Sequence, residues 1–259
     1  MGKATTKRLA KQGARLLLVN RNQEKGNAAV REIIDASGNE SVTFLQADLS
    51  LVQEMRRAAQ CARQTFDRLD ILVHGAGGVF PPKRTMTAEG LELVFAVQYL
   101  ARYLITDHLI DLLHAAPSPQ VMSIAGGGRS KGVDFDNLQG EKSYSILGTV
   151  ERAGATCDLL TTEHIDRYRD IVFYNYGPGI VRTMATMPNR LMWLLVNTVL
   201  RPFSRTAEQA ANDIVTLLTG EHRGGFYGTS LKQNEFKVVK SDAAKLWDHS
   251  KQLIDNLSA

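Results

Sequence analysis

Glycine-rich segments follow three apolar runs of this chain, and their residue types suit the binding of a ligand against the backbone. The runs are residues 70–73, 120–124 and 170–175. The residues that follow them are Gly75, Ala76, Gly77, Gly126, Pro178 and Gly179. Because glycine carries no side chain beyond hydrogen, a ligand can come close to the main chain there. If the runs are parallel strands, these residues lie together at the carboxyl edge of a sheet, where such sheets bind ligands.

The elements that position these residues alternate between strands and helices. Short apolar runs predict strands at 15–20, 42–46, 70–73, 120–124 and 170–175, with a short last strand at Phe226-Tyr227. Capping residues and glycines delimit predicted helices at 4–12, 22–36, 51–66, 88–114 (as a pair), 150–167, 207–218 and 243–257. This alternation predicts parallel strands joined by right-handed crossovers. The sequence therefore predicts an α/β fold, a doubly wound parallel sheet, in a single domain over residues 1–259.

An apolar segment at about 184–204 interrupts the alternation. Its most apolar part is L-M-W-L-L-V-N-T-V-L at 191–200, which is too short to span a bilayer. Two interpretations remain open for it. The segment is either a lid over a small apolar substrate, or a core or dimer helix, in which case the protein is a homo-oligomer.

Composition and charge exclude several classes of protein. The chain has 259 residues, 44% hydrophobic and 22% charged, as expected of a globular protein with a full core. Its formal charge is +4, but the basic residues are spread along the chain, so nucleic acid is not an expected partner. Cys61 and Cys157 form neither a disulfide framework nor a metal-ligand cluster. With no apolar signal core at the start, we expect a cytoplasmic protein without a metal.

Six motifs in order resemble the short-chain dehydrogenase/reductase superfamily, and within it the retinol-dehydrogenase-like branch. They are L-L-L-V-N-R-N at 16–22, Q-A-D-L-S at 46–50, D-I-L-V-H-G-A-G at 70–77, P-G-I-V-R-T at 178–183, R-P-F-S-R-T-A-E-Q-A-A at 201–211 and A-A-K-L-W-D-H-S at 243–250. No single motif is specific, but their order is, and together they cover essentially the whole chain. The resemblance implies a Rossmann-like fold and an oxidoreductase that uses NAD(P)(H).

The resemblance also implies which residues bind the cofactor. They are Arg21, Asp48, Leu49, Gly75, Ala76, Gly77, Pro178, Gly179 and Thr183. A cation just past the second strand of such a fold meets a 2′-phosphate, whereas an acid there binds the ribose hydroxyls. Neither Asn20 nor Arg21 is acidic, so NADP(H) is favoured over NAD(H). The structural alternatives are that Arg21 is a solvated turn residue and that Asp48 caps a helix.

The start of the chain departs from the family pattern. The family opens with a central strand and a glycine-rich turn, and the following helix holds the pyrophosphate at its N-terminus. Here Gly2-Lys3-Ala4 corresponds only to the end of that turn. We therefore expect a sheet without the usual first strand, two inner edges with unpaired backbone groups, and weak or vestigial NADP binding. An incomplete chain is favoured over a rearranged sheet as the explanation.

The catalytic positions depart from the pattern as well. The family uses a Tyr as general acid/base, a Lys one helical turn later that lowers its pKa, and a Ser that orients the carbonyl. Alignment on neighbouring motifs places Gly126 at the Ser position, Val150 at the Tyr position and Gly154 at the Lys position. The supporting Asn of the family is Gln98. Independently of any alignment, no Tyr in the chain is followed by a Lys four residues later.

Three functions remain open, and no residue is assigned a catalytic role. The first is an oxidoreductase of a lipophilic alcohol or carbonyl with a non-standard acid, for which His74 and Tyr144 are the first residues to test. The second is a catalytically inactive pseudo-oxidoreductase that acts by binding a ligand or partner. The third is an isomerase or cyclase that uses the same pocket. For His74, packing or hydrogen bonding in the core is the more frequent role.

Overall fold

Parallel strands form two sheets in the computed structural model, which describes residues 1–78, 80–130, 132–182, 204–236 and 239–257. One sheet holds β1 and β2, and the other holds β3 to β7 in the order of their numbers. The strands are β1 (Leu16–Asn20), β2 (Val42–Gln46), β3 (Ile71–His74), β4 (Gln120–Ile124), β5 (Val172–Tyr176), β6 (Gly225–Tyr227) and β7 (Gln233–Asn234). All neighbouring pairs are parallel except β6 and β7. The predicted α/β fold with a parallel sheet is confirmed.

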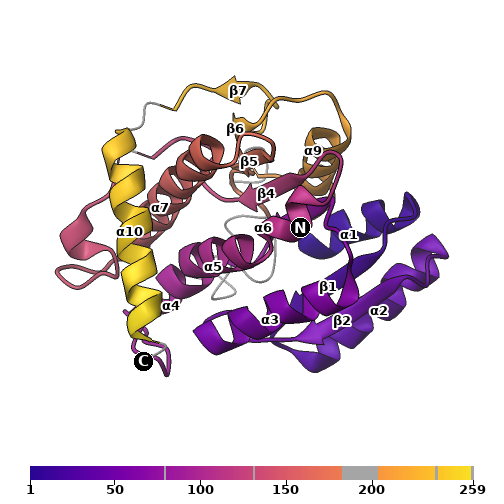
Figure 1. The fold of residues 1–259 in the computed structure, drawn as a ribbon, viewed down its shortest axis with the longest axis horizontal. Helices are drawn as coiled ribbons and strands as arrows, with labels where there is room; N and C mark the ends of the chain where they lie inside the picture. The colour runs from indigo at the N-terminus through magenta and orange to yellow at the C-terminus, as the bar shows by residue number, and fades with distance from the viewer. Residues whose placement is uncertain (79, 131, 183–203, 237–238, 258–259) are drawn as a thin grey trace.

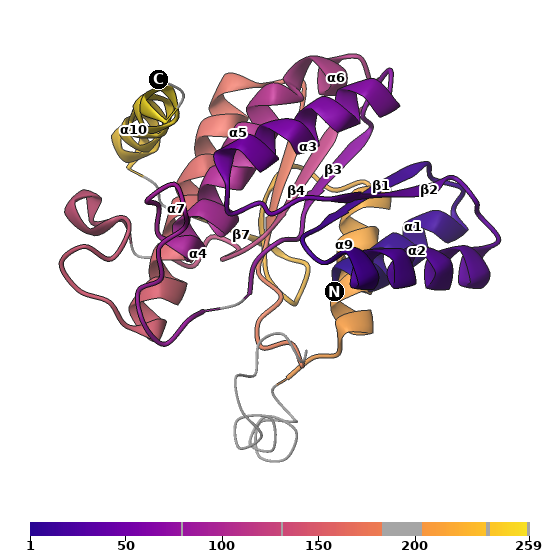
Figure 2. The ribbon, with the colours of Figure 1, turned by 90° about the horizontal axis from the view of Figure 1, so that it is seen from below.

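Helices cover both faces of the sheets (Figure 1). The helical elements are α1 (Gly2–Lys11), α2 (Gln23–Ser37), α3 (Val52–Thr65), α4 (Leu93–Phe95), the π-helix η1 (Ala96–Leu100), α5 (Ala101–His108), α6 (Ile110–His114), the 3-10 turn η2 (Phe135–Asn137), α7 (Ile146–Arg167), α9 (Ala207–Thr219) and α10 (Lys240–Asn256). Figure 2 shows α3 and α5 on one side of the strands and α1, α2 and α9 on the other. This is the layering of a doubly wound sheet.

Two strands have an edge that no described strand covers. α1 is the first described element, and β1 follows it. Among the described residues, β1 pairs with β2 alone and β3 pairs with β4 alone, so each has one edge without a strand neighbour. Their apolar runs are of the kind that parallel strands bury on both faces. Yet the side chains of Leu16–Leu18 and Ile71–Val73 are only half-buried here.

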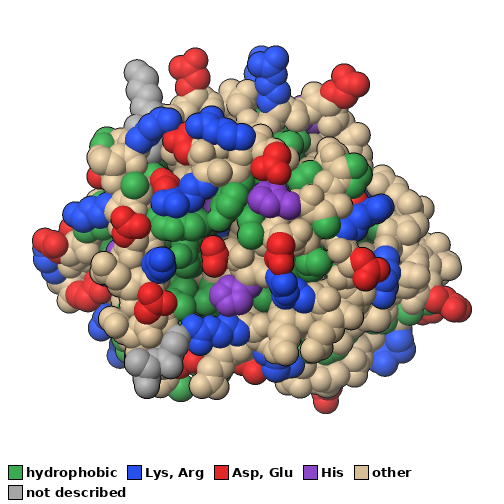
Figure 3. Space-filling model, in the orientation of Figure 1, with side chains coloured by type: hydrophobic (Ala, Val, Ile, Leu, Met, Phe, Trp, Pro, Cys, Tyr) green, Lys and Arg blue, Asp and Glu red, His purple; other side chains and the backbone are tan. Residues whose placement is uncertain are grey.

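The main core lies between the second sheet and the helices α3, α5, α7 and α10. Met55, Leu100 and Leu104 are fully buried in it, and Trp247 of α10 packs edge-on against Tyr103 at 4.7 Å between ring centroids. A separate cluster joins β4, β5 and β6 to α9, and a third joins α1, α2 and β2. On the face shown in Figure 3, basic and acidic side chains are interspersed rather than gathered by sign.

Local capping sets several helix boundaries, and it corrects two of the predicted ones. The Asn22 side chain accepts a hydrogen bond from the amide of Lys25, so the predicted cap of α2 is confirmed. The prediction that the helix at 150–167 begins at Val150 is wrong, because Ser145 caps the helix one turn earlier. The predicted helix start at residue 88 is also wrong, since Met86 and Glu92 form an antiparallel bridge and α4 begins only at Leu93.

The sequence predicted the strand at Phe226-Tyr227 but missed the strand that follows it. The pair Phe226-Tyr227 lies in β6 as expected, but β7 follows it and pairs antiparallel at the sheet edge. β7 consists of Gln233 and Asn234 alone, and neither residue belongs to an apolar run. Its pairing rests on the backbone, so no hydrophobic pattern marks it.

Candidate functional site

The carboxyl ends of β3, β4 and β5 bring the predicted glycine segments side by side. The register pairs His74 with Ser123 and Ile124 with Tyr176. The ladder continues past the strands, because the amide of Ala125 donates to the Tyr176 carbonyl at 2.8 Å. The segments that begin at Gly75, Ala125 and Gly177 therefore leave the sheet at one edge. Asp48, Gly77, Gly126 and Pro178 were predicted to converge on one edge. The structure brings Gly77, Gly126 and Pro178 to the carboxyl edge of this sheet, whereas Asp48 follows β2, which belongs to the other sheet.

Two of these segments are packed on each other so closely that glycine is needed. A Cβ at Gly127 would lie 2.5 Å from the Tyr227 carbonyl oxygen and 2.8 Å from the amide nitrogen of Gly177. A Cβ at Gly177 would lie 2.8 Å from the Gly126 carbonyl oxygen. Real side chains are not found at such distances from backbone. The glycine run after β4 therefore serves backbone packing, in addition to any role towards a ligand.

Gly126 also lies against helix α7. A Cβ at Gly126 would lie 3.2 Å from the Cα of Gly154 and 3.3 Å from both carboxylate oxygens of Asp158. The residues that stand at the family's Ser and Lys positions are thus in near contact through their backbones. A side chain at position 126 would therefore be crowded, whereas a Cβ at Gly154 would lie in ordinary contact, 3.8 Å from the Cα of Gly126. Sequence alignment placed these two glycines at the site, and the structure shows that their smallness brings strand end and helix together.

Asp158 holds the loop after β4 in place. One of its oxygens accepts the amide of Gly128 at 3.0 Å and the side chain of Asn175 at 2.9 Å, and the other accepts the hydroxyl of Ser130 at 2.7 Å. The Asn175 oxygen in turn accepts the amide of Gly127 at 2.9 Å. Burial raises the pKa of the Asp158 carboxyl, while these donors act in the opposite direction.

Asp158 was missed by the sequence reasoning, although a signal for it existed. An acidic residue within C-D-L-L, on the buried stripe of a long helix, is unusual unless it has partners. What the sequence could not show is that its partners are loop amides rather than a ligand.

The predicted Tyr position carries no group that could transfer a proton. Val150 is a hydrocarbon side chain, 44% exposed on the first turns of α7. Tyr144, one of the two alternative acids, donates its hydroxyl to the Pro81 carbonyl at 3.1 Å. The general acid of the family therefore has no counterpart at the position that alignment assigns to it.

His74, the other alternative acid, lies inside the protein. Its Nε2 shares a hydrogen bond of 2.8 Å with the hydroxyl of Thr106, and it is 8% exposed. Burial, with help from the nearby Arg102, lowers the pKa of His74 well below its usual value. The ring is a neutral, hydrogen-bonded core residue, which favours the structural interpretation over a role as a base.

The residues predicted for the adenosine half of a cofactor flank β1 and β2. The Arg21 side chain is exposed, and its carbonyl accepts from the Gln46 side chain at 3.2 Å. Asp48 does not cap α3 as the structural alternative supposed, because its carboxylate accepts the Ser50 amide in the turn before that helix. Instead, the carboxylate of Glu89 accepts the amide of Val52 at 2.6 Å. Leu49 is half-buried.

The remaining residues predicted to bind the cofactor, Pro178, Gly179 and Thr183, are only partly described. Pro178 is half-buried, and Gly179 is exposed with a φ of 67°. Thr183 and the predicted lid at 184–204 lie outside the described residues, except for Ser204. The two ends of that segment are tied together, since Arg182 donates its amide to the Arg205 carbonyl at 2.9 Å and Arg205 donates to Ile180 at 2.8 Å.

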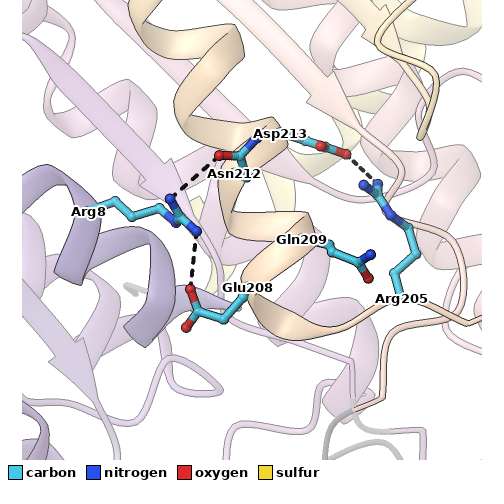
Figure 4. A pocket seen from close by; sticks show the side chains of 6 residues that line it. All are labelled: Arg8, Arg205, Glu208, Gln209, Asn212 and Asp213. Atoms are coloured by element: carbon cyan, nitrogen blue, oxygen red, sulfur yellow. Dashed lines mark hydrogen bonds and ion pairs between the residues drawn. The ribbon is translucent and has the colours of Figure 1, made fainter.

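A cleft of about 310 Å³ lies between α1 and α9, and its charged groups pair with one another (Figure 4). Arg8 reaches Glu208 at 3.3 Å and Asn212 at 3.5 Å. Arg205 pairs with Asp213, which also accepts the hydroxyl of Tyr176. None of the residues predicted to bind the cofactor lines this cleft. Because its cations already have carboxylate partners, it offers a ligand little uncompensated charge.

Neither a metal-ligand cluster nor a membrane span is found in the described ranges. No group of three or more His, Cys, Asp or Glu residues there could hold a metal ion. Within the described part of the chain, no helix is both long and apolar enough to cross a bilayer.

Comparison with known proteins decides the family. The model of the short chain dehydrogenase family matches residues 1–133. The chain belongs to that family. Oxidoreductase andH of Emericella variicolor is 31% identical over 229 residues, which cover 85% of this chain and 66% of that protein. Human retinol dehydrogenase 11 is 27% identical over 268 residues, which cover 98% of this chain and 82% of that protein.

Solved structures support the same fold. An uncharacterised protein from Mycobacterium paratuberculosis superimposes with a TM-score of 0.74 at 20% identity, covering 98% of this chain and 89% of that one. An alcohol dehydrogenase from Thermococcus sibiricus, complexed with 5-hydroxy-NADP, gives a TM-score of 0.66 at 19% identity, covering 91% and 94%. A metagenomic short-chain oxidoreductase in complex with NADP gives 0.61 at 21% identity, covering 88% and 91%. Members of this family with this fold thus bind NAD(P).

The chain's own residues fit such a cofactor in part. The first-turn amides of α1 are capped by no side chain, which suits a phosphate, and the exposed Gly77 holds a φ of 130° at the sheet edge. Arg21 is exposed and free to meet a 2′-phosphate. At the reacting end, however, Gly126 and Gly154 are nearly in contact. The fit is therefore better for binding a nucleotide than for reacting with it.

Proposed function

We propose that this chain is a pseudo-oxidoreductase of the short-chain dehydrogenase family, which binds NADP(H) weakly and an apolar small molecule but does not catalyse ordinary Ser-Tyr-Lys carbonyl reduction. The observation that carries this proposal is the approach of Gly126 to Gly154, with 3.2 Å between the Cβ position of the first and the Cα of the second. NADPH supplies a hydride when bound, but the carbonyl oxygen that accepts a proton needs a donor and a tuned charge beside it.

The residues at the carboxyl edge of the sheet supply neither a proton donor nor a charge that would tune one. General acid catalysis contributes about 10²–10⁴-fold to rates of this kind. Val150 has no proton to transfer, and Asp158, the nearby acid, already accepts from loop amides and a hydroxyl. The chain is thus expected to retain binding and to lose most of the rate.

An apolar ligand is supported by the surface of α7 at this edge. Ile146, Leu147 and Val150 expose 44%, 82% and 44% of their surface. They lie on the turns that precede Gly154, which itself contacts the loop after β4. Hydrocarbon on that surface suits a lipophilic molecule better than a sugar or an acid.

A second candidate function is carbonyl or alcohol turnover by a non-standard acid. The similarity to named oxidoreductases along 85% and 98% of this chain favours it. Tyr144 is then the residue to test, because it is half-exposed at the start of α7, whereas His74 is enclosed.

Calorimetry and a turnover assay on the same protein separate the two candidates. We expect NADPH to bind more tightly than NADH, with a dissociation constant nearer millimolar than micromolar, and Arg21→Ala to remove the preference. Arg31→Ala, an exposed arginine on α2, is the matched control. We expect no oxidation of NADPH above background with a panel of lipophilic aldehydes and ketones.

Turnover of several per second by the native chain would overturn the proposal. If Tyr144→Phe then abolished that turnover, the second candidate would stand. Micromolar binding of NADPH without turnover would contradict only the expected weakness of the nucleotide site.

A further inference from the structure

A buried guanidinium lies behind the loop that follows β3, and most of its donors lack acceptors. Arg102 of α5 is 2% exposed. Its Nη2 donates to the carbonyl of Ile124 at 2.8 Å and more weakly to that of Ala76 at 3.5 Å. Its Nε and Nη1 have no hydrogen-bond partner among the described residues. No carboxylate within the described ranges forms an ion pair with it either. A buried charge in this state is costly unless something compensates it.

A second buried donor lies on the same helical stretch. Gln98, four residues before Arg102, is 8% exposed, and its Nε2 has no partner in the described part of the chain. Both side chains pack against the same loop. A Cβ at Gly77 would lie 2.8 Å from the Gln98 side chain, and Arg102 donates to the carbonyl of the neighbouring Ala76. The π-helix η1 lets this stretch bulge there, and the Gln98 carbonyl accepts the thiol of Cys157 at 3.0 Å.

Among the described residues, the neighbouring groups satisfy neither the Nε and Nη1 of Arg102 nor the Nε2 of Gln98. The ring of His74 is already engaged with Thr106, and the Ile124 carbonyl already accepts from Nη2. The cluster is therefore rich in donors and carries one uncompensated positive charge, next to loop residues 75–77, which are exposed.

We propose that Arg102 and Gln98 form a binding site for a monovalent oxyanion behind the loop at residues 75–77. A single negative charge balances the guanidinium, and an oxygen of a carboxylate can accept from Nε or Nη1, the two nitrogens that lack a partner. The amide of Gln98 supplies a further donor. The ligand is either a small free anion such as formate or the carboxylate head of a larger molecule that enters over the loop.

This site goes beyond the proposed function, because neither NADP(H) nor an apolar carbonyl compound needs a buried cation at this place. Nucleotide binding and the anion site can fail independently of each other.

The test is thermal unfolding of the full chain during titration with sodium formate, at an ionic strength held constant with sodium fluoride. We expect the unfolding temperature of the native chain to rise with formate and to saturate, as binding to the folded state requires. Arg31→Met, which changes an exposed arginine, should behave like the native chain. Gln98→Leu should weaken the apparent affinity about tenfold, the effect of one lost hydrogen bond to a charged group.

Arg102→Met should lose the response to formate altogether. It should also be at least as stable as the native chain in fluoride alone, because an uncompensated buried charge is replaced by a hydrocarbon of similar length. Should Arg102→Met fail to fold, Arg102→Lys keeps the charge without the fork and should show a weakened response.

The two sources of the anion are distinguished by a series from formate to acetate, butyrate and hexanoate. Affinity that rises severalfold with each added methylene indicates the head of an apolar carboxylate. If the protein binds formate but does not bind acetate or butyrate, the ligand is a small free anion. A native chain that does not respond to any of the four, or variants at Arg102 that respond as the native chain does, would overturn the proposal.

Discussion

Replacing each of the two facing glycines by alanine should change stability in opposite directions. The Cβ of Gly126→Ala would lie 3.2 Å from the Cα of Gly154 and 3.3 Å from the carboxylate of Asp158, so backbone or carboxylate must shift. Overpacking of this kind costs about 1–3 kcal/mol. The Cβ of Gly154→Ala meets only the Cα of Gly126, at 3.8 Å, which is ordinary contact. Because alanine favours a helix over glycine, that change should stabilise the chain by about 0.5–1 kcal/mol.

Urea unfolding followed by circular dichroism measures both effects. With an m-value of about 3 kcal/mol/M, a loss of 2 kcal/mol moves the midpoint down by about 0.7 M. Gly2→Ala, at the start of α1 with open space around it, is the control for the generic effect of a methyl group. The double variant should be less stable than the sum of the single changes predicts, since the two residues are in contact.

Equal and favourable effects of the two alanines would refute this reasoning. They would mean that the loop after β4 does not lie against α7 in solution. The volume for a Ser side chain at position 126 would then exist, and the main support for a pseudo-oxidoreductase would be lost.

Two further predictions concern buried groups away from the site. Burial lowers the pKa of His164 to about 3, so the folded state keeps the ring neutral and stability is lost as the pH falls from 6.5 towards 3. Between pH 7 and pH 5, urea unfolding should show the native chain losing about 2 kcal/mol more stability than His164→Phe. Equal losses in the two proteins would contradict this prediction. Glu89→Ala removes the carboxylate that accepts the first amide of α3 and should cost about 1 kcal/mol in the same assay, whereas Glu24→Ala, an exposed acid in the first turn of α2, should cost less.

Local patterns predicted the elements well where a residue acts on its own neighbours. The apolar run at 16–20 formed β1, and Asn22 capped the helix that follows it. The predictions failed where a segment far away in the sequence determines the local structure. Glu89 was read as part of a helix, but its carboxylate caps α3, thirty-seven residues back along the chain. β7 exists because its backbone meets the edge of β6, and a two-residue strand has no periodicity to detect.

The sequence likewise predicted some features of the candidate site and missed others. Motif order placed Gly77, Gly126 and Pro178 at one edge, because parallel strands determine where their ends lie. The cofactor roles of Arg21, Asp48 and Pro178 stay predictions. The sequence could not show that Arg102 lies buried with its Nε and Nη1 unpartnered among the described residues, since an arginine on a helix is ordinarily solvated.

The two glycines, Gly126 and Gly154, depend on each other, and this determines what restoring the family's catalytic side chains would do. Glycine at both 126 and 154 allows the strand end to approach the helix. The approach puts Asp158 beneath the loop, where it accepts from Gly128 and Ser130. A serine restored at position 126 therefore meets a carboxylate and a helix backbone instead of a substrate carbonyl. Gly126→Ser alone should therefore cost stability before it yields any rate, so the family's three side chains must be restored together.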